Sequence, residues 1–145
     1  MILAADPGSV KTGLAVLQED GTLIWKGIIP TGELEHTLKE IMSAYIIDVF
    51  VIGNGTHHKE VKKQVCNWFA AMNKNIQTAV VNEKYTTEMG EAWFWKYNPP
   101  QGFKRLIPKG LRTVPVPIDD YVAWIIGCIY LGIVKEEDVK HKKSE

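Results

Sequence analysis

The sequence predicts an α/β fold with one mixed five-stranded sheet and helices on both of its faces. Short apolar runs of strand length alternate with longer segments whose apolar residues recur at helical spacing. The first three runs are separated only by turns, which predicts an antiparallel meander, whereas each later run follows a helix, which predicts parallel strands. A chain of 145 residues can bury a substantial core, so we expect residues 1–145 to form a single domain.

The opening of the chain predicts the meander. Residues 2–5 are a short apolar run that stops at an Asp-Pro-Gly turn, and residues 13–17 are again strand-like. An Asp-Gly pair at residues 20–21 predicts a hairpin turn, because these residues tolerate positive φ. The third strand, residues 22–29, is closed by Pro30.

Helices and buried strands alternate after the meander. Residues 31–45, 58–74 and 86–97 carry apolar side chains at helical spacing, with charged residues between them. The runs 49–52 and 78–81 are short and mostly apolar, as in parallel strands that are buried on both faces. These segments predict two right-handed crossovers that extend the meander into one sheet.

The last third of the chain begins with a proline-rich segment. Residues 98–117 contain five of the seven prolines and no acidic residue, which predicts a long loop. Residues 119–134 predict the most apolar helix, and we expect the tail from Lys135 to be solvated. The apolar run from residue 121 to residue 134 is shorter than the roughly 20 residues that span a bilayer, so we expect a buried helix.

Charge and cysteine usage limit the function classes. The 17 basic and 17 acidic residues sum to a net charge of zero, which argues against a uniformly basic nucleic-acid coat but leaves room for local basic patches. Cys66 and Cys128 do not form a disulfide framework and fit a reducing compartment. The first residues lack the basic start of a signal peptide, so we expect a cytoplasmic protein without a membrane partner.

Several acidic residues lie where a predicted strand ends or a predicted helix begins. Asp6 ends the first predicted strand, Glu83 follows the last one, and the final helix begins with Asp119 and Asp120. Because function gathers outside the carboxyl ends of parallel strands, these side chains are expected to converge. Carboxylates held together repel one another unless a cation is bound, and hard oxygen ligands favour Mg²⁺ or Mn²⁺. Two such ions about 4 Å apart, bound together with substrate, can activate a water molecule and stabilise the leaving oxygen when a phosphodiester is hydrolysed.

Each acidic residue also has a structural interpretation. Asp6 before Pro7 and Gly8 is a common turn residue, and Glu83 is compatible with an exposed carboxylate at a strand end. Asp119 or Asp120 is a natural helix cap. The joint placement of the four residues, rather than any one of them, favours a metal-binding site.

Basic residues flank the proposed site in two groups. The segment from Lys96 to Ile118 contains basic residues and no acid, and a second cluster of histidines and lysines follows the glycine loop near residue 55. Phosphate binding requires such local density, although the lysines of the second cluster also fit a solvated helix face. The candidate nucleic-acid contacts are Lys11, Lys59, Lys84, Lys104, Arg105, Lys109 and Arg112.

Four segments carry a resemblance to a known family. In chain order they are Asp6-Pro7-Gly8-Ser9-Val10-Lys11-Thr12-Gly13, Val51-Ile52-Gly53-Asn54-Gly55-Thr56, Asn82-Glu83-Lys84-Tyr85-Thr86-Thr87 and Ile118-Asp119-Asp120-Tyr121-Val122-Ala123. With these segments the chain is similar to the RNase H-like superfamily, in the group that holds the RuvC and YqgF Holliday-junction nucleases. The second segment resembles the glycine-rich loop of YqgF-type domains, including the domain embedded in the Tex transcription factor.

The resemblance implies both a fold and a set of site residues. It implies an RNase H-like domain in which Asp6, Glu83 and either Asp119 or Asp120 are catalytic and bind the metal. RuvC-type nucleases carry a catalytic Glu at the end of the fourth strand, where this chain has Gly53 or Asn54. YqgF-type domains place the second acid one strand later, where Glu83 stands. The acid pattern is therefore YqgF-like; Asp119 aligns with the YqgF acid, and Asp120 fits the RuvC position.

Three hypotheses follow from the sequence. The first, implied by the resemblance, is a metal-dependent endonuclease that resolves Holliday junctions or trims the precursor of small-subunit ribosomal RNA. Resolving a junction needs two sites on symmetric strands, so this hypothesis includes a homodimer. The second is a nucleic-acid-binding or assembly module without catalysis. The third, a sugar-kinase-like or actin-like ATPase, needs two such domains around a nucleotide, and 145 residues supply one.

Overall fold

The computed structural model describes residues 1–108 and 113–134. These residues form five strands, four α-helices and two short 3₁₀ helices. In chain order the elements are β1 (Ile2–Asp6), β2 (Lys11–Leu17), β3 (Leu23–Pro30), η1 (Thr31–Glu33), α1 (Leu34–Ala44), β4 (Val49–Gly53), α2 (His58–Ala71), β5 (Gln77–Val81), α3 (Thr86–Tyr97), η2 (Gly102–Leu106) and α4 (Asp119–Tyr130).

The five strands form a single sheet in the order β3-β2-β1-β4-β5. The pairs β1–β2 and β2–β3 are antiparallel, whereas β1–β4 and β4–β5 are parallel. The predicted meander and the predicted parallel strands are therefore confirmed. Strands β1 and β4 lie at the centre of the sheet, which explains why their sequences are almost entirely apolar.

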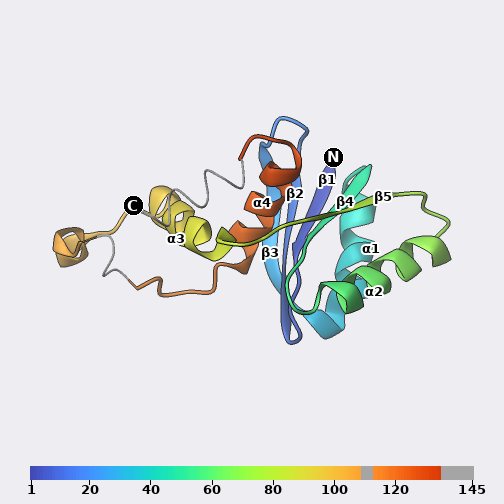
Figure 1. Cartoon of the computed structure of the whole chain (residues 1–145), viewed down its shortest axis with the longest axis horizontal. Coiled ribbons are helices and arrows are strands. Elements are labelled where there is room, and N and C mark those ends of the chain that lie inside the picture. The colour runs from blue at the N-terminus through green and yellow to red at the C-terminus, as the bar shows by residue number, and fades with distance from the viewer. Residues whose placement is uncertain (109–112, 135–145) are drawn as a thin grey trace.

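Helices cover both faces of the sheet, as the sequence predicts (Figure 1). On one face, α1 and α2 pack against the side chains of Leu3, Leu14 and Phe50. On the other face, α4 packs against the neighbouring residues of the same strands, including Ala4 and Val51. Helix α3 contacts α4 and lies on its outer side, away from the sheet.

Several element boundaries differ from those predicted; helix α2, for example, ends at Ala71 rather than at residue 74. The first helical segment opens with the 3₁₀ helix η1, and the predicted long loop contains η2. Helix α4 ends at Tyr130 rather than at residue 134, because Gly132 adopts a left-handed conformation (φ 75°). The amide of Gly132 donates to the Ile129 carbonyl and that of Ile133 to the Cys128 carbonyl, which is the Schellman ending of a helix.

Two predictions for the end of the chain fall partly or wholly outside the described residues. The tail from Lys135 lies outside them, as do residues 109–112 of the proline-rich loop. Within the part of the chain that the structure describes, no helix combines the length and the apolar character that crossing a bilayer requires.

Candidate active site

Three acidic side chains meet at the carboxyl end of the central strands. Asp6 is the last residue of β1, Glu83 lies two residues beyond β5, and Asp119 is the first residue of α4. The carboxyl group of Asp6 lies within hydrogen-bonding reach of those of Glu83 and Asp119. The structure thus brings together the end of a central strand, the end of an edge strand and the start of the last helix.

Asp119 reaches this cluster because β2 has a glycine where α4 crosses it. Gly13 is the register partner of Asp6 in the antiparallel pair β1–β2. A Cβ atom on Gly13 would overlap the backbone carbonyl of Asp119, and it would lie 2.9 Å from the Cβ atom of Asp119. The absent side chain therefore lets the first turn of α4 touch the sheet directly beside Asp6.

The turn after Asp6 is fixed by a threonine from the end of β3. The Thr31 hydroxyl donates to the Gly8 carbonyl at 2.8 Å and lies 2.8 Å from the buried Thr12 hydroxyl. The Thr31 amide donates to the Val10 carbonyl at 2.9 Å. These bonds hold the β1–β2 connection, and with it Asp6, against the third strand.

Glu83 is fixed by hydrogen bonds to its backbone on both sides. Its carbonyl accepts from the Thr86 amide at 3.0 Å and from the Thr86 hydroxyl at 2.6 Å. Its amide donates to Asn54 Oδ1 at 3.1 Å, which links the turn after β5 to the loop after β4. The Glu83 side chain is thereby directed back across β4 toward Asp6.

Burial and mutual repulsion change the acidity of the cluster. Burial raises the pKa of Asp6 to about 8, with further contributions from the charges of Glu83 and Asp119 and from its hydrogen bonds with both. Burial also raises the pKa of Glu83, while the hydrogen bond from Asp6 and the charge of His58 oppose that rise. The raised pKa favours the protonated form of Asp6 at neutral pH, in which one proton lies between Asp6 and its acidic neighbours.

The donor set of this cluster fits a hard divalent cation. Glu83 Oε2 is buried and accepts no hydrogen bond from the described residues, whereas the buried Asp119 Oδ2 faces a lysine. The ammonium of Lys11 lies 3.1 Å from Asp119 Oδ2 and forms an ion pair with it. Buried anionic oxygens without donors are costly, and carboxylate oxygens are the ligands that Mg²⁺ and Mn²⁺ prefer.

The carboxyl groups contact one another rather than surround a common point. Among residues 1–108 and 113–134, no three acidic, histidine or cysteine side chains are arranged as a ready-made set of metal ligands. Binding of a cation would therefore require Asp6 to release its proton.

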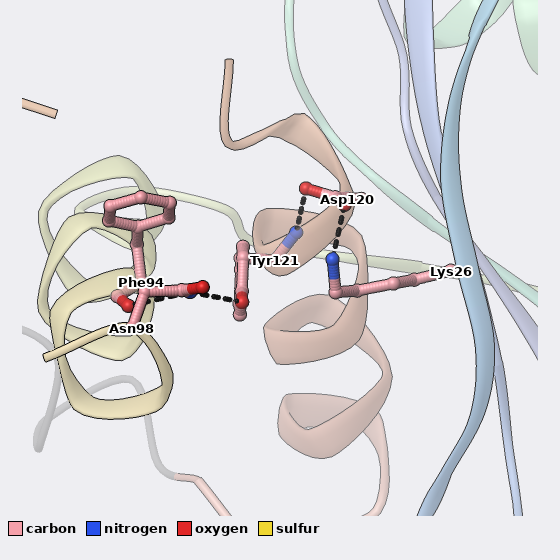
Figure 2. A network of polar contacts seen from close by, with 5 residues as sticks. All are labelled: Lys26, Phe94, Asn98, Asp120 and Tyr121. Carbon is pink, nitrogen blue, oxygen red and sulfur yellow. Dashed lines mark hydrogen bonds and ion pairs between the residues drawn. The ribbon is translucent and has the colours of Figure 1, made fainter. Parts of the chain in front are cut away.

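Asp120 points away from the cluster. Its Oδ2 atom lies 2.5 Å from the Lys26 ammonium, and its Oδ1 atom accepts from the Tyr121 amide at 2.9 Å (Figure 2). The same ammonium lies 4.1 Å from the centre of the Tyr121 ring. Of the two acids that the sequence leaves open, the structure brings Asp119 to Asp6 and pairs Asp120 with β3.

The predicted phosphate contacts occupy different places. Lys11 lies at the acidic cluster, and Lys84 directly follows Glu83, with its ammonium 5.2 Å from the Tyr85 ring centre. Lys59 is exposed in the first turn of α2, and Arg105 is exposed in η2, where its Nε donates to the Gly102 carbonyl at 3.4 Å. Lys109 and Arg112 lie outside the described residues, as does the side chain of Lys104.

The roles of two residues beside the site were not predicted from the sequence. Lys26 lies on β3 beside Ala15, on the face that α4 covers, and a lysine at such a position signals a partner on the covering helix. Asn54 stands between two glycines in the loop after β4. Its bond to the Glu83 amide joins segments far apart in sequence, for which the sequence carries no local signal.

The sheet order and the strand directions are those of the predicted RNase H-like α/β fold. A sequence profile of the Tex protein YqgF-like domain matches residues 1–87, which include Asp6 and Glu83. The chain therefore belongs to the family of Tex protein YqgF-like domains.

Two individual proteins are also similar to this chain. The uncharacterized protein YdcI of Bacillus subtilis (strain 168) is 31% identical over 91 residues, which are 57% of this chain and 12% of YdcI. The chain thus spans a small fraction of the length of this relative. A solved RuvC structure from Thermus thermophilus has a TM-score of 0.49 and 12% identity, over 87% of this chain and 89% of that chain.

Proposed function

We propose that residues 1–145 act as one metal-dependent endonuclease domain that hydrolyses phosphodiester bonds in structured nucleic acid. The observation that carries this proposal is the convergence of Asp6, Glu83 and Asp119, in which the buried Glu83 Oε2 accepts no hydrogen bond from the described residues and Asp119 Oδ2 pairs with Lys11. Membership of the Tex protein YqgF-like family supports the proposal, because the fold is of the nuclease type.

The three acids would hold Mg²⁺ or Mn²⁺. When bound, two such ions activate a water molecule and stabilise the leaving oxygen of a phosphodiester. Asp6, once it has lost its proton, would serve as one ligand, and Glu83 and Asp119 would offer their buried oxygens. Lys11, half-exposed beside Asp119, is placed to bind a phosphate of the substrate at the edge of the site.

Nucleic acid would approach along the exposed basic side chains. Lys84 and Lys59 extend the positive charge of Lys11 on the Glu83 side, and Arg105 together with Lys104, Lys109 and Arg112 would add contacts from the proline-rich loop. The substrate is a four-way DNA junction or a ribosomal RNA precursor. For a junction the active species is a homodimer, and the setting is the cytoplasm.

A cleavage panel tests the proposal. The substrates are a four-way junction, a flap and a small-subunit ribosomal RNA precursor, each incubated with Mg²⁺, Mn²⁺ or EDTA. We expect cleavage of one substrate class with either ion, no cleavage in EDTA, and loss of cleavage in Asp6→Asn. Equal cleavage by Asp6→Asn would contradict the role of Asp6, and metal-independent cleavage would contradict the metal role.

One observation favours a second candidate, a nucleic-acid-binding module without catalysis. The acidic side chains within the described residues are not pre-arranged as metal ligands. The same substrates decide between the two candidates. Binding of a substrate in a gel-shift assay, without its cleavage in any metal, supports the second.

A further inference from the structure

Gly53, the last residue of β4, and the loop that follows it lie directly against the carboxylate of Glu83. A Cβ atom on Gly53 would overlap Glu83 Oε2, and a Cβ atom on Gly55 would overlap Glu83 Oε1. The two carboxylate oxygens therefore occupy the space in which the side chains of residues 53 and 55 would begin. Any residue larger than glycine at either position competes with the carboxylate for this space.

The same loop also holds the backbone of Glu83. Asn54 Oδ1 accepts from the Glu83 amide at 3.1 Å, and the Asn54 amide donates to the Val81 carbonyl at 3.0 Å. The loop is tied to the start of α2, since His58 Nδ1 lies 2.8 Å from the Gly55 carbonyl oxygen and the His58 amide donates to that oxygen at 3.0 Å. Glu83 is thus held at its amide and at its carboxylate by three consecutive residues of another strand's loop.

We propose that Gly53, Asn54 and Gly55 are positioning residues that place the Glu83 carboxylate beside Asp6. The two glycines provide the space, and Asn54 fixes the direction from which the side chain enters it. The geometry also implies that an acid on this loop can replace Glu83, because the positions of the two missing side chains coincide with its carboxylate. The expected effect of these residues on metal binding rests on the proposed function. The close approach of Gly53 and Gly55 to the Glu83 carboxylate does not.

The steric relationship is tested by thermal unfolding in EDTA. Gly55 is the better probe, because the three atoms nearest to its added Cβ all belong to the Glu83 side chain. We expect Gly55→Ala to lower the Tm relative to Gly32→Ala in the native background, by less than a clash with backbone would, and to have little effect in a Glu83→Ala background. Gly32→Ala is the matched control, since its Cβ would meet no atom within 4 Å. Equal losses of Tm for Gly55→Ala in both backgrounds would overturn the proposal.

The positioning role is tested by Mn²⁺ binding, measured from the free-ion signal in electron paramagnetic resonance. We expect Asn54→Ala to weaken binding about 10–100-fold, the range that is typical for residues that orient metal ligands. Glu83→Ala is expected to lose binding, and adding Gly55→Asp to Glu83→Ala is expected to restore part of it. Gly55→Asn in the same background has the same shape without the charge and should restore none.

The outcomes separate this proposal from the proposed function. Unchanged Mn²⁺ affinity in Asn54→Ala, or no difference between the Asp and Asn substitutions at Gly55, would overturn the positioning role while the native chain still binds the ion. If the native chain fails to bind Mn²⁺, the proposed metal site is wrong, and the unfolding experiment in EDTA alone supports or overturns the placement of Glu83 by the loop.

Discussion

Lys26 and Asp120 form an ion pair between β3 and the first turn of α4, with Nζ and Oδ2 2.5 Å apart. The preceding residue, Asp119, pairs instead with Lys11 of β2 at 3.1 Å. Two consecutive acids are therefore bound by lysines of two neighbouring strands (Figure 2 shows the Lys26 pair). Asp119 therefore belongs to the acidic cluster, whereas the ion pair of Asp120 links α4 to the sheet.

The first prediction separates these two acids. Asp119→Asn should lower the cleavage rate by about 100-fold or more, the scale on which losing one electrostatic stabiliser reduces kcat. Asp120→Asn should leave the cleavage rate within a few-fold of the native value but lower the Tm, because the half-buried Lys26 ammonium loses its anion. Single-turnover cleavage and thermal unfolding measure the two effects. The reverse pattern would show that Asp120 is the acid of the site.

The second prediction concerns the glycine that lets α4 approach β2. Gly13→Ala places a Cβ atom where the Asp119 carbonyl lies, and backbone atoms yield less readily than the end of a flexible side chain. We expect the free energy of unfolding to fall by about 3 kcal/mol, the upper end of the usual cost of overpacking. Urea unfolding measures it, with Gly32→Ala as the control. An equal, small effect in both variants would contradict the close approach.

The third prediction follows from the raised pKa of Asp6. In the unfolded chain this pKa is 3.8, and in the folded protein burial and the neighbouring acids raise it to about 8. Between these values the folded state binds the extra proton, so without divalent cations stability should fall as the pH rises from about 4 to 8. Glu83, whose pKa is also raised, acts in the same direction.

Substitution of Asp6 isolates its share of this pH dependence. In EDTA, Asp6→Asn should raise the Tm above that of the native chain at pH 8, and the difference should shrink toward pH 5. Asp20→Asn is the control: hydrogen bonds with Thr22 lower the pKa of this exposed acid, so its contribution changes only below about pH 4. A Tm difference for Asp6→Asn that does not vary between pH 5 and pH 8 would contradict the raised pKa.

Periodicity and turn residues were sufficient to predict the order and type of the main elements. The strands and helices differ strongly in their apolar spacing, and the acids at strand ends follow from the general placement of sites in α/β sheets. Which of Asp119 and Asp120 joins Asp6 could not be predicted from the sequence, because it depends on ion pairs with Lys11 and Lys26, which lie on distant strands.

Close contacts between distant segments were equally hidden in the sequence. Gly53 and Gly55 indicate a loop, but nothing local shows that the missing side chains make room for Glu83, nearly thirty residues away. The end of α4 was predicted too late, because the apolar pattern continues past Gly132 although its left-handed conformation ends the helix.

Calorimetric titration with Mn²⁺ at pH 7.5 tests the central claim, that Asp6, Glu83 and Asp119 form a divalent-cation site. We predict saturable binding to the native chain, accompanied by proton release as Asp6 becomes a ligand. Binding should be at least about tenfold weaker in Asp6→Asn and nearly unchanged in Asp120→Asn. Absence of binding to the native chain, or equal affinity in Asp6→Asn, would contradict the claim.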